Sequence, residues 1–167
     1  QESGKFVLAY SMSFGDTGNS FGGYYLAAAA DEIWMQPVGS LAITGLSAEL
    51  PFGRAALEKL GITPQFVKRK EYKSAAAPAM QSDLDPATKE MMTAIITDLG
   101  GQFVEDVAKD RNLSEQTVKD LIDVGVFLDK EAIEAGLIDR LAYGDTLVDE
   151  MNTRISGDKE SRDAKFI

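Results

Sequence analysis

The sequence predicts an α/β fold with parallel strands, and three observations support this prediction. Short apolar runs, which are typical of strands, alternate with helix-forming segments over residues 5–67. In the second half, apolar residues recur at every fourth position, as expected for an amphipathic helix. The chain has 167 residues, of which 44% are hydrophobic and 26% charged, and this is enough for one globular core. We therefore expect a single domain over residues 1–155 and a polar tail or linker over residues 156–167.

Glycine and proline positions divide the first half into short elements. The run KFVLAYS is aromatic and β-branched, so it predicts a buried strand, whereas FGGYYLAAAA is a strong helix former. Pro51 suits the first turn of a later helix, and Gly61 suits its end. The expected elements are strand 5–11, a polar loop 13–20, helix 21–30, strand 31–37, extended segment 39–46, helix 51–61 and strand 62–67.

The second half is predicted to be helical. Asp85 before Pro86 supplies a helix cap and a first-turn residue, and Ser114 supplies the cap of a shorter helix. The expected elements are a long helix from residue 85 to beyond 107, helices 114–124, 129–136 and 145–155, and an extended segment 137–141. The apolar stripe of the long helix predicts a core face or a subunit interface, and its members are Met91, Ile95, Leu99, Phe103 and Val107.

Composition excludes several classes of function. There is no Cys and no His, so thiol nucleophiles, imidazole bases and most zinc sites are ruled out, and we expect neither a metal nor a cofactor. The net charge of -10 argues against a nucleic-acid partner. No apolar run approaches the roughly 18 residues that span a bilayer. A strand is expected directly after Gly4, so we expect the sequence to be a piece of a longer polypeptide.

Lys73 is the first candidate for chemistry. It ends a basic cluster within FVKRKEYKSAAAPAM, residues 66–80, and is followed by Ser74 and three alanines. A lysine at the border of packed structure and beside other cations is disfavoured as an ammonium, which makes it a usable general base. Ser74 is placed to orient the amine, or it is an ordinary loop serine. The alternative for the whole cluster is a solvated basic face.

The glycine pair at the start of the first predicted helix is the second candidate. Gly22 and Gly23 leave backbone N–H groups at the helix entrance open to an oxyanion or another anion. Glycine pairs at helix entrances also serve close packing, and the sequence alone does not decide between the two roles.

The chain resembles the signal peptide peptidase A family, bacterial membrane-bound Ser/Lys peptidases. The segments that carry the resemblance are FGGYYLAAAADEIWMQP at 21–37, GSLAITG at 39–45, EYKSAAAP at 71–78 and DKEAIEAGLIDRL at 129–141. The resemblance implies a ClpP/crotonase-like spiral of repeated β-β-α units with a helical C-terminal part. It also implies that Lys73 is the general base and that a nucleophilic serine directly precedes Gly-Gly-Tyr.

The chain departs from the family at the nucleophile. Phe21 stands directly before Gly22, and phenylalanine has no nucleophilic atom. Ser20 is one residue earlier, and a shift of one residue at a helix entrance turns a side chain by about 100°. Ser20 is therefore a weak alternative nucleophile, because nucleophilic catalysis needs tight geometry.

The long form of the family resembles a tandem duplication, and this chain resembles its first, lysine-bearing repeat. The resemblance then implies half of a serine endopeptidase that hydrolyses apolar, cleaved signal peptides, with the serine supplied by a second repeat. It further implies a homotetramer, anchored by a segment outside this sequence to the periplasmic side of the bacterial inner membrane. Leu41 and Ile43 are expected in a strand that either pairs with an extended substrate or lies inside a sheet.

Two other functions remain open. In the first alternative, the chain is a non-catalytic repeat that serves as an oligomerisation scaffold, with the long helix as the interface. The other alternative is a crotonase-type acyl-CoA enzyme, which shares the fold. Such enzymes usually use a carboxylate, and the sequence singles out no Asp or Glu for this role.

Overall fold

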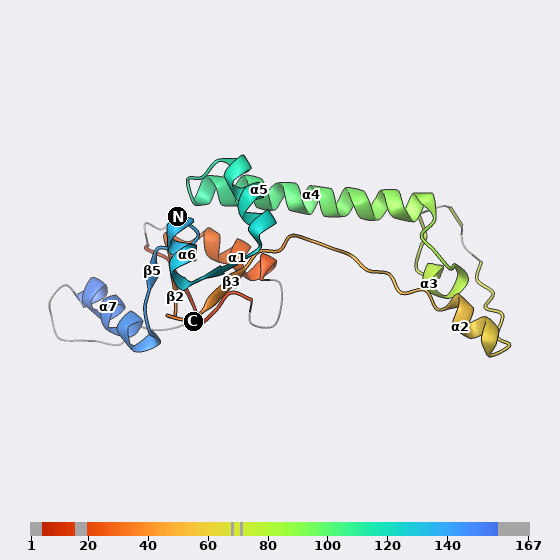
Figure 1. Ribbon diagram of the computed structural model, residues 1–167, viewed down its shortest axis with the longest axis horizontal. Helices are drawn as coiled ribbons and strands as arrows, with labels where there is room; N and C mark the ends of the chain where they lie inside the picture. Colours follow the sequence, from red (N-terminus) through yellow and green to blue (C-terminus); the bar gives the residue numbers. More distant parts are fainter. Residues whose placement is uncertain (1–4, 16–19, 68, 71, 157–167) are drawn as a thin grey trace. The chain divides into compact units, whose positions relative to one another are not determined.

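The computed structural model describes residues 5–15, 20–67, 69–70 and 72–156, and the chain divides into two compact units (Figure 1). Unit 1 consists of Gln1–Gly45 and Phe103–Ile167, and unit 2 consists of Leu46–Gln102. Unit 1 contains β1 (Leu8–Ser11), α1 (Phe21–Ala28), β2 (Glu32–Met35), β3 (Ser40–Ala42), α5 (Glu115–Val124), β4 (Val126–Leu128), α6 (Asp129–Glu134), β5 (Arg140–Leu141) and α7 (Gly144–Ser156). Unit 2 contains α2 (Arg54–Lys59) and α3 (Ala77–Met80), and α4 (Pro86–Asp110) contributes residues to both units.

Unit 1 is built on two small sheets. The first has the order β1-β2-β5 and is parallel throughout, with Leu8 opposite Glu32 and Trp34 opposite Arg140. This confirms the prediction of a mixed α/β fold with parallel strands. The second sheet pairs β3 with β4 antiparallel, and β4 was not predicted from the sequence. The spiral of repeated β-β-α units stays a prediction.

Strand β2 divides the apolar side chains of unit 1 between its two faces. Successive side chains of a strand point to opposite faces, so Ile33 and Met35 enter the main core while Trp34 packs with Ala142 and Leu147. The main core also receives Tyr24, whose hydroxyl donates to the Leu137 carbonyl at 2.8 Å and whose pKa is raised by burial. The sheet is therefore covered on both faces.

The long helix α4 was predicted correctly, including its cap, but its apolar stripe has two different environments. Phe103 and Val107 are fully buried in the core of unit 1. Ile95 and Leu99, in the part of the helix that belongs to unit 2, are 46% and 49% exposed. Only the C-terminal part of the predicted stripe is therefore core within the chain.

A buried arginine joins the end of α4 to the first sheet. Arg111 makes two hydrogen bonds to the Asp139 carboxylate, at 2.7 and 3.0 Å, and its Nε donates to the Gly136 carbonyl at 3.1 Å. The same carboxylate accepts the N–H of Ile33 on β2 at 2.7 Å. Only 7% of the Arg111 side chain is exposed, so its charge depends on Asp139 for compensation.

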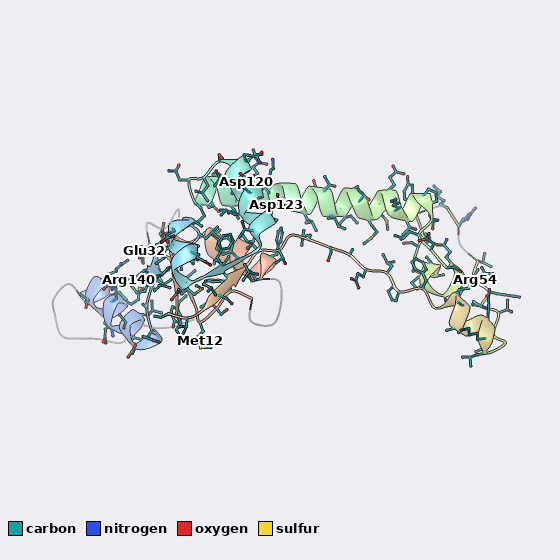
Figure 2. The ribbon with its side chains drawn as sticks, viewed as in Figure 1. Met12, Glu32, Arg54, Asp120, Asp123 and Arg140 are labelled. Atoms are coloured by element: carbon teal, nitrogen blue, oxygen red, sulfur yellow. The ribbon has the colours of Figure 1, made fainter. Side chains whose placement is uncertain are left out.

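Charged and aromatic side chains attach α7 to the other face of this sheet. Arg154 on α7 lies 3.0 Å from the Glu32 carboxylate and also pairs with Glu150. Arg140 stands over the Trp34 ring at 4.5 Å, and Figure 2 shows Glu32 and Arg140 on this side of unit 1. The hydrogen bond from Arg154 lowers the pKa of Glu150, and bonds to both carboxylates raise the pKa of Arg154. These contacts fix α7 mainly through polar groups.

Unit 2 has little apolar core of its own. Among its described residues, Ala77 and Thr88 are buried. Asp85 caps α4 by accepting the N–H of Thr88 at 3.0 Å, and the Gly53 N–H donates to the Pro78 carbonyl at 2.7 Å. Caps and turns therefore contribute a large part of the order in this unit.

Two predictions in unit 2 were wrong. Residues 62–67 form no strand: Ile62, Phe66 and Val67 are exposed, and no described segment pairs with them. A β-branched run needs a neighbouring strand to satisfy its backbone, so propensity alone misled here. The helix expected from Pro51 begins at Arg54 and buries none of its residues.

Ser156 ends α7, and the expected tail beyond it lies outside the described residues.

We expect Asp139→Ala to lower the free energy of unfolding of unit 1 by roughly 2–4 kcal/mol, because it leaves the Arg111 charge and the Ile33 N–H without their acceptor. Urea unfolding followed by the fluorescence of Trp34, the single tryptophan, measures this unit. Glu115→Gln is the control: it removes the exposed pair with Lys119 at 3.4 Å and should cost at most about 0.5 kcal/mol. Equal losses in the two variants would contradict the prediction.

Candidate functional site

Ser20 stands at the entrance of α1, where its backbone and side chain are both hydrogen bonded. Its Oγ donates to the Ala42 carbonyl at 2.7 Å, and its N–H donates to the same oxygen at 3.1 Å. The Ser20 carbonyl accepts the N–H of Tyr24 at 2.7 Å. The hydroxyl proton is therefore directed at a backbone carbonyl, and the residue ties α1 to β3. The role of Ser20 as an alternative nucleophile stays a prediction.

Phe21, at the position where the family resemblance places a serine, belongs to the packing of unit 1. Its ring stacks on that of Phe103 with centroids 3.7 Å apart and an angle of 21° between the planes. Tyr25 stacks on the same ring at 6.0 Å. An aromatic side chain thus occupies the first position of the helix and packs against α4.

The glycine pair of α1 lies in open space. A Cβ added at Gly22 or Gly23 would meet no atom within 4 Å, and neither residue has a positive φ. Gly39 is a useful contrast, because a Cβ there would collide with the Met12 carbonyl oxygen. Close packing against the described residues of unit 1 therefore does not account for the pair. Gly23 also lines a cavity of ≈ 520 Å³ with Ser20 and residues of β1.

Leu41 and Ile43 are fully buried in the core of unit 1. Leu41 pairs with Phe127 of β4 on one side, and Phe14 forms a parallel bridge to it on the other. The Ile43 N–H donates to the Gly125 carbonyl at 2.8 Å. The structure thus places Leu41 in β3 and Ile43 directly after it, both in the core. Their role in pairing with an extended substrate stays a prediction.

Lys73 lies in unit 2, on a segment without regular structure before α3. Its side chain is exposed and lines a cavity of ≈ 190 Å³, whose other lining residues are Phe66, Ala76, Ala77, Met80 and Gln81. Lys73 therefore lines a cavity whose other lining side chains are mostly apolar, and it is not enclosed by the unit. Its role as the general base stays a prediction. Lys68 and Glu71, which belong to the same predicted basic segment, lie outside the described residues.

The residues after Lys73 form a tight turn into α3. The Ser74 carbonyl accepts the N–H of Ala77 at 2.8 Å, which fixes the backbone next to the lysine. Gln81 follows the end of α3, and its amide donates to Asp85 at 2.9 Å. Sequence reasoning did not single out Gln81, because a glutamine at a helix end carries no motif.

The predicted residues fall into two groups that the structure describes separately. Ser20 and the glycine pair belong to unit 1, and Lys73 with Ser74 belongs to unit 2. Within the described ranges, no cluster of acidic side chains is arranged to hold a metal ion, and no helix is long and apolar enough to cross a bilayer. The predicted site residues offer a lysine amine, serine hydroxyls and backbone N–H groups.

Comparison with known proteins identifies the family. The model of Peptidase family S49 matches residues 1–156. Protease 4 of Haemophilus influenzae is 33% identical over 118 residues, which cover 71% of this chain and 18% of that protein. The chloroplastic serine protease SPPA of Arabidopsis thaliana is 25% identical over 162 residues, which cover 97% of this chain and 23% of that protein. The putative protease slr0021 of Synechocystis is 35% identical over 132 residues, which cover 77% of this chain and 46% of that protein. The chain thus spans less than half the length of each of these relatives.

We expect Gly23→Ala to raise the free energy of unfolding of unit 1 by about 0.5–1 kcal/mol, because alanine is the better helix former and its Cβ meets no atom. Urea unfolding followed by Trp34 fluorescence measures the change. Gly39→Ala is the matched control and should destabilise the unit, since its Cβ would collide with the Met12 carbonyl. A loss of stability in the Gly23 variant would show that hidden packing constrains the glycine pair.

Proposed function

This chain belongs to peptidase family S49, and we propose that it is the lysine-bearing half of a membrane-associated serine peptidase that hydrolyses cleaved signal peptides. In this proposal Lys73 is the general base and a second repeat of the same protein supplies the nucleophilic serine. The observation that carries this proposal is that the chain contains the lysine segment of the family but has Phe21, not a serine, directly before the glycine pair.

The environment of the α1 entrance supports a serine from outside the chain. Phe21 is engaged in a ring stack with Phe103, and the Ser20 hydroxyl donates to the Ala42 carbonyl. A nucleophile must present its oxygen to a substrate carbonyl and its proton to the base. Neither residue meets both conditions, so the entrance lacks a ready nucleophile.

The exposure of Lys73 supports the same division of labour. A general base has to come within hydrogen-bond reach of the hydroxyl that it deprotonates. Since that hydroxyl would come from another repeat, the amine has to be accessible from outside unit 2, and the Lys73 side chain is exposed beside its apolar cavity. An amine sealed inside the unit would not meet an external serine.

The proposed reaction is an acyl transfer. Neutral Lys73 takes the proton of the serine hydroxyl as the oxygen attacks the peptide carbonyl, and backbone N–H groups near the serine stabilise the oxyanion. The protonated amine then returns the proton to the leaving amine, and water releases the acyl group. The four-subunit assembly, the membrane anchor outside this sequence and the periplasmic location are proposed from the family resemblance alone.

One alternative function has structural support. The apolar residues Ile95 and Leu99 are exposed on α4, and the described part of unit 2 buries little apolar surface. Such a surface suits a non-catalytic repeat that serves as an oligomerisation scaffold. No observation favours the acyl-CoA enzyme.

We expect Lys73→Ala in the full-length protein to lower kcat for an apolar peptide by roughly 10²–10⁴-fold, because it removes the proposed general base. Peptide hydrolysis at neutral pH measures the loss. Lys59→Ala, which removes a lysine of α2 with no proposed role, should leave the rate unchanged. Hydrolysis retained in the Lys73 variant would eliminate the base assignment.

We expect this chain alone to show no turnover of an activated ester or an apolar peptide, and to gain activity when the second repeat is added. The physical reason is that base and nucleophile would meet only in the pair. The matched control is the same mixture made with the Lys73→Ala chain. Equal activity in the two mixtures would instead favour the scaffold alternative.

A further inference from the structure

Gln81 has an amide whose orientation is fixed by its neighbour. Its Nε2 donates to Asp85 Oδ2 at 2.9 Å, and the same oxygen accepts the Thr88 hydroxyl at 2.9 Å. An ionised carboxylate only accepts hydrogen bonds, so the nitrogen of the amide has to be the atom that faces Asp85. The Oε1 atom is therefore held on the other side of the amide group.

This Oε1 atom is buried and has no hydrogen-bond partner within the described part of the chain. A buried acceptor without a donor is costly, so one left in a fixed orientation calls for an explanation. Gln81 also lines the ≈ 190 Å³ cavity beside Lys73. The other lining residues are Phe66, Ala76, Ala77 and Met80, whose side chains carry no donor. Among the lining side chains that the structure describes, Lys73 is therefore the donor available to this oxygen.

We propose that Gln81 is a positioning residue for Lys73. The contact is not made in this structure; it forms when the lysine side chain turns toward the cavity, so that Oε1 accepts a hydrogen bond from Nζ and holds the amine there. The chemistry suits a base. A neutral amine has two N–H donors and one lone pair, so donating to Oε1 leaves the lone pair free to take a proton. An amide oxygen is also uncharged, so it orients the amine without the negative charge that would favour the ammonium form.

The contact is tested by the reactivity of the amine. Reductive methylation of the intact chain, with the rate at Lys73 followed by peptide mass spectrometry, measures how freely the side chain moves and reacts. Gln81→Leu removes the acceptor, and we expect methylation of Lys73 to be about two- to tenfold faster, the range that one hydrogen bond supplies. Gln116→Leu is the matched control, because Gln116 makes the same contact four residues along, to Asp120 at 2.8 Å, on the surface of α5. An unchanged rate in the Gln81 variant would overturn the proposal.

A second variant covers the case in which Gln81→Leu does not fold, as judged by circular dichroism. Gln81→Glu combined with Asp85→Asn reverses the amide–carboxylate pair and keeps an acceptor oxygen for Lys73. We expect methylation at Lys73 to be as slow as in the unmodified chain or slower. A faster rate would contradict the contact, since the acceptor is still present.

The catalytic consequence rests on the proposed function and is measured separately. In the full-length protein, Gln81→Leu should lower kcat by about two- to tenfold and leave KM unchanged, because the amine is misplaced while substrate contacts remain. Activity that survives Lys73→Ala would refute the proposed function, yet the methylation rates would still decide whether Gln81 holds the amine. Slower hydrolysis with unchanged methylation would refute the positioning role alone.

Discussion

The carboxylate of Asp139 is the constraint on which unit 1 depends. It accepts the N–H of Ile33 at one edge of β2 and two hydrogen bonds from Arg111, just beyond the end of α4. The guanidinium is almost fully buried, so its desolvation has to be offset, and the fixed fork of Arg111 also reaches the Gly136 carbonyl. These hydrogen bonds fix the position of the C-terminal end of α4 relative to the sheet. The buried aromatic rings of the core pack with side chains of these two elements.

Unit 2 is organised by a carboxylate as well, but in a different way. Asp85 serves the cap of α4 and the amide of Gln81, while few side chains of the unit are buried. Segments with few buried apolar contacts open locally at lower free-energy cost than a packed core. The lysine is therefore carried by the part of the chain that is held by local hydrogen bonds. This would suit a general base that, as proposed, has to meet a serine from another repeat. At the α1 entrance, by contrast, Phe21 packs against Phe103 of the core.

Local signals explain what the sequence predicts well and where it fails. The cap at Ser114, the cap at Asp85 and the long helix depend on residues within a few positions of one another, and all are present in the structure. Strand β4 has three residues and exists because β3 lies beside it, so no local pattern identifies it. The motif singles out Lys73 as a candidate, but it leaves open whether the side chain borders packed structure or is solvated, and the structure shows it exposed. The position of Gln81 depends on Asp85 and on a cavity formed by six residues, which a linear pattern does not contain.

Phe21 connects the stability of unit 1 with the proposed loss of a nucleophile. A serine at this position would be polar and would forgo the stack with Phe103, and aromatic pairs of this kind contribute roughly 0.5–1.5 kcal/mol beyond area burial. Active-site groups are commonly kept at some cost in stability. A repeat that leaves the nucleophile to its partner is released from this cost, so it can fill the helix entrance with core packing. The open glycine pair beside Phe21 has no such packing role, because an added Cβ there would contact no neighbouring atom.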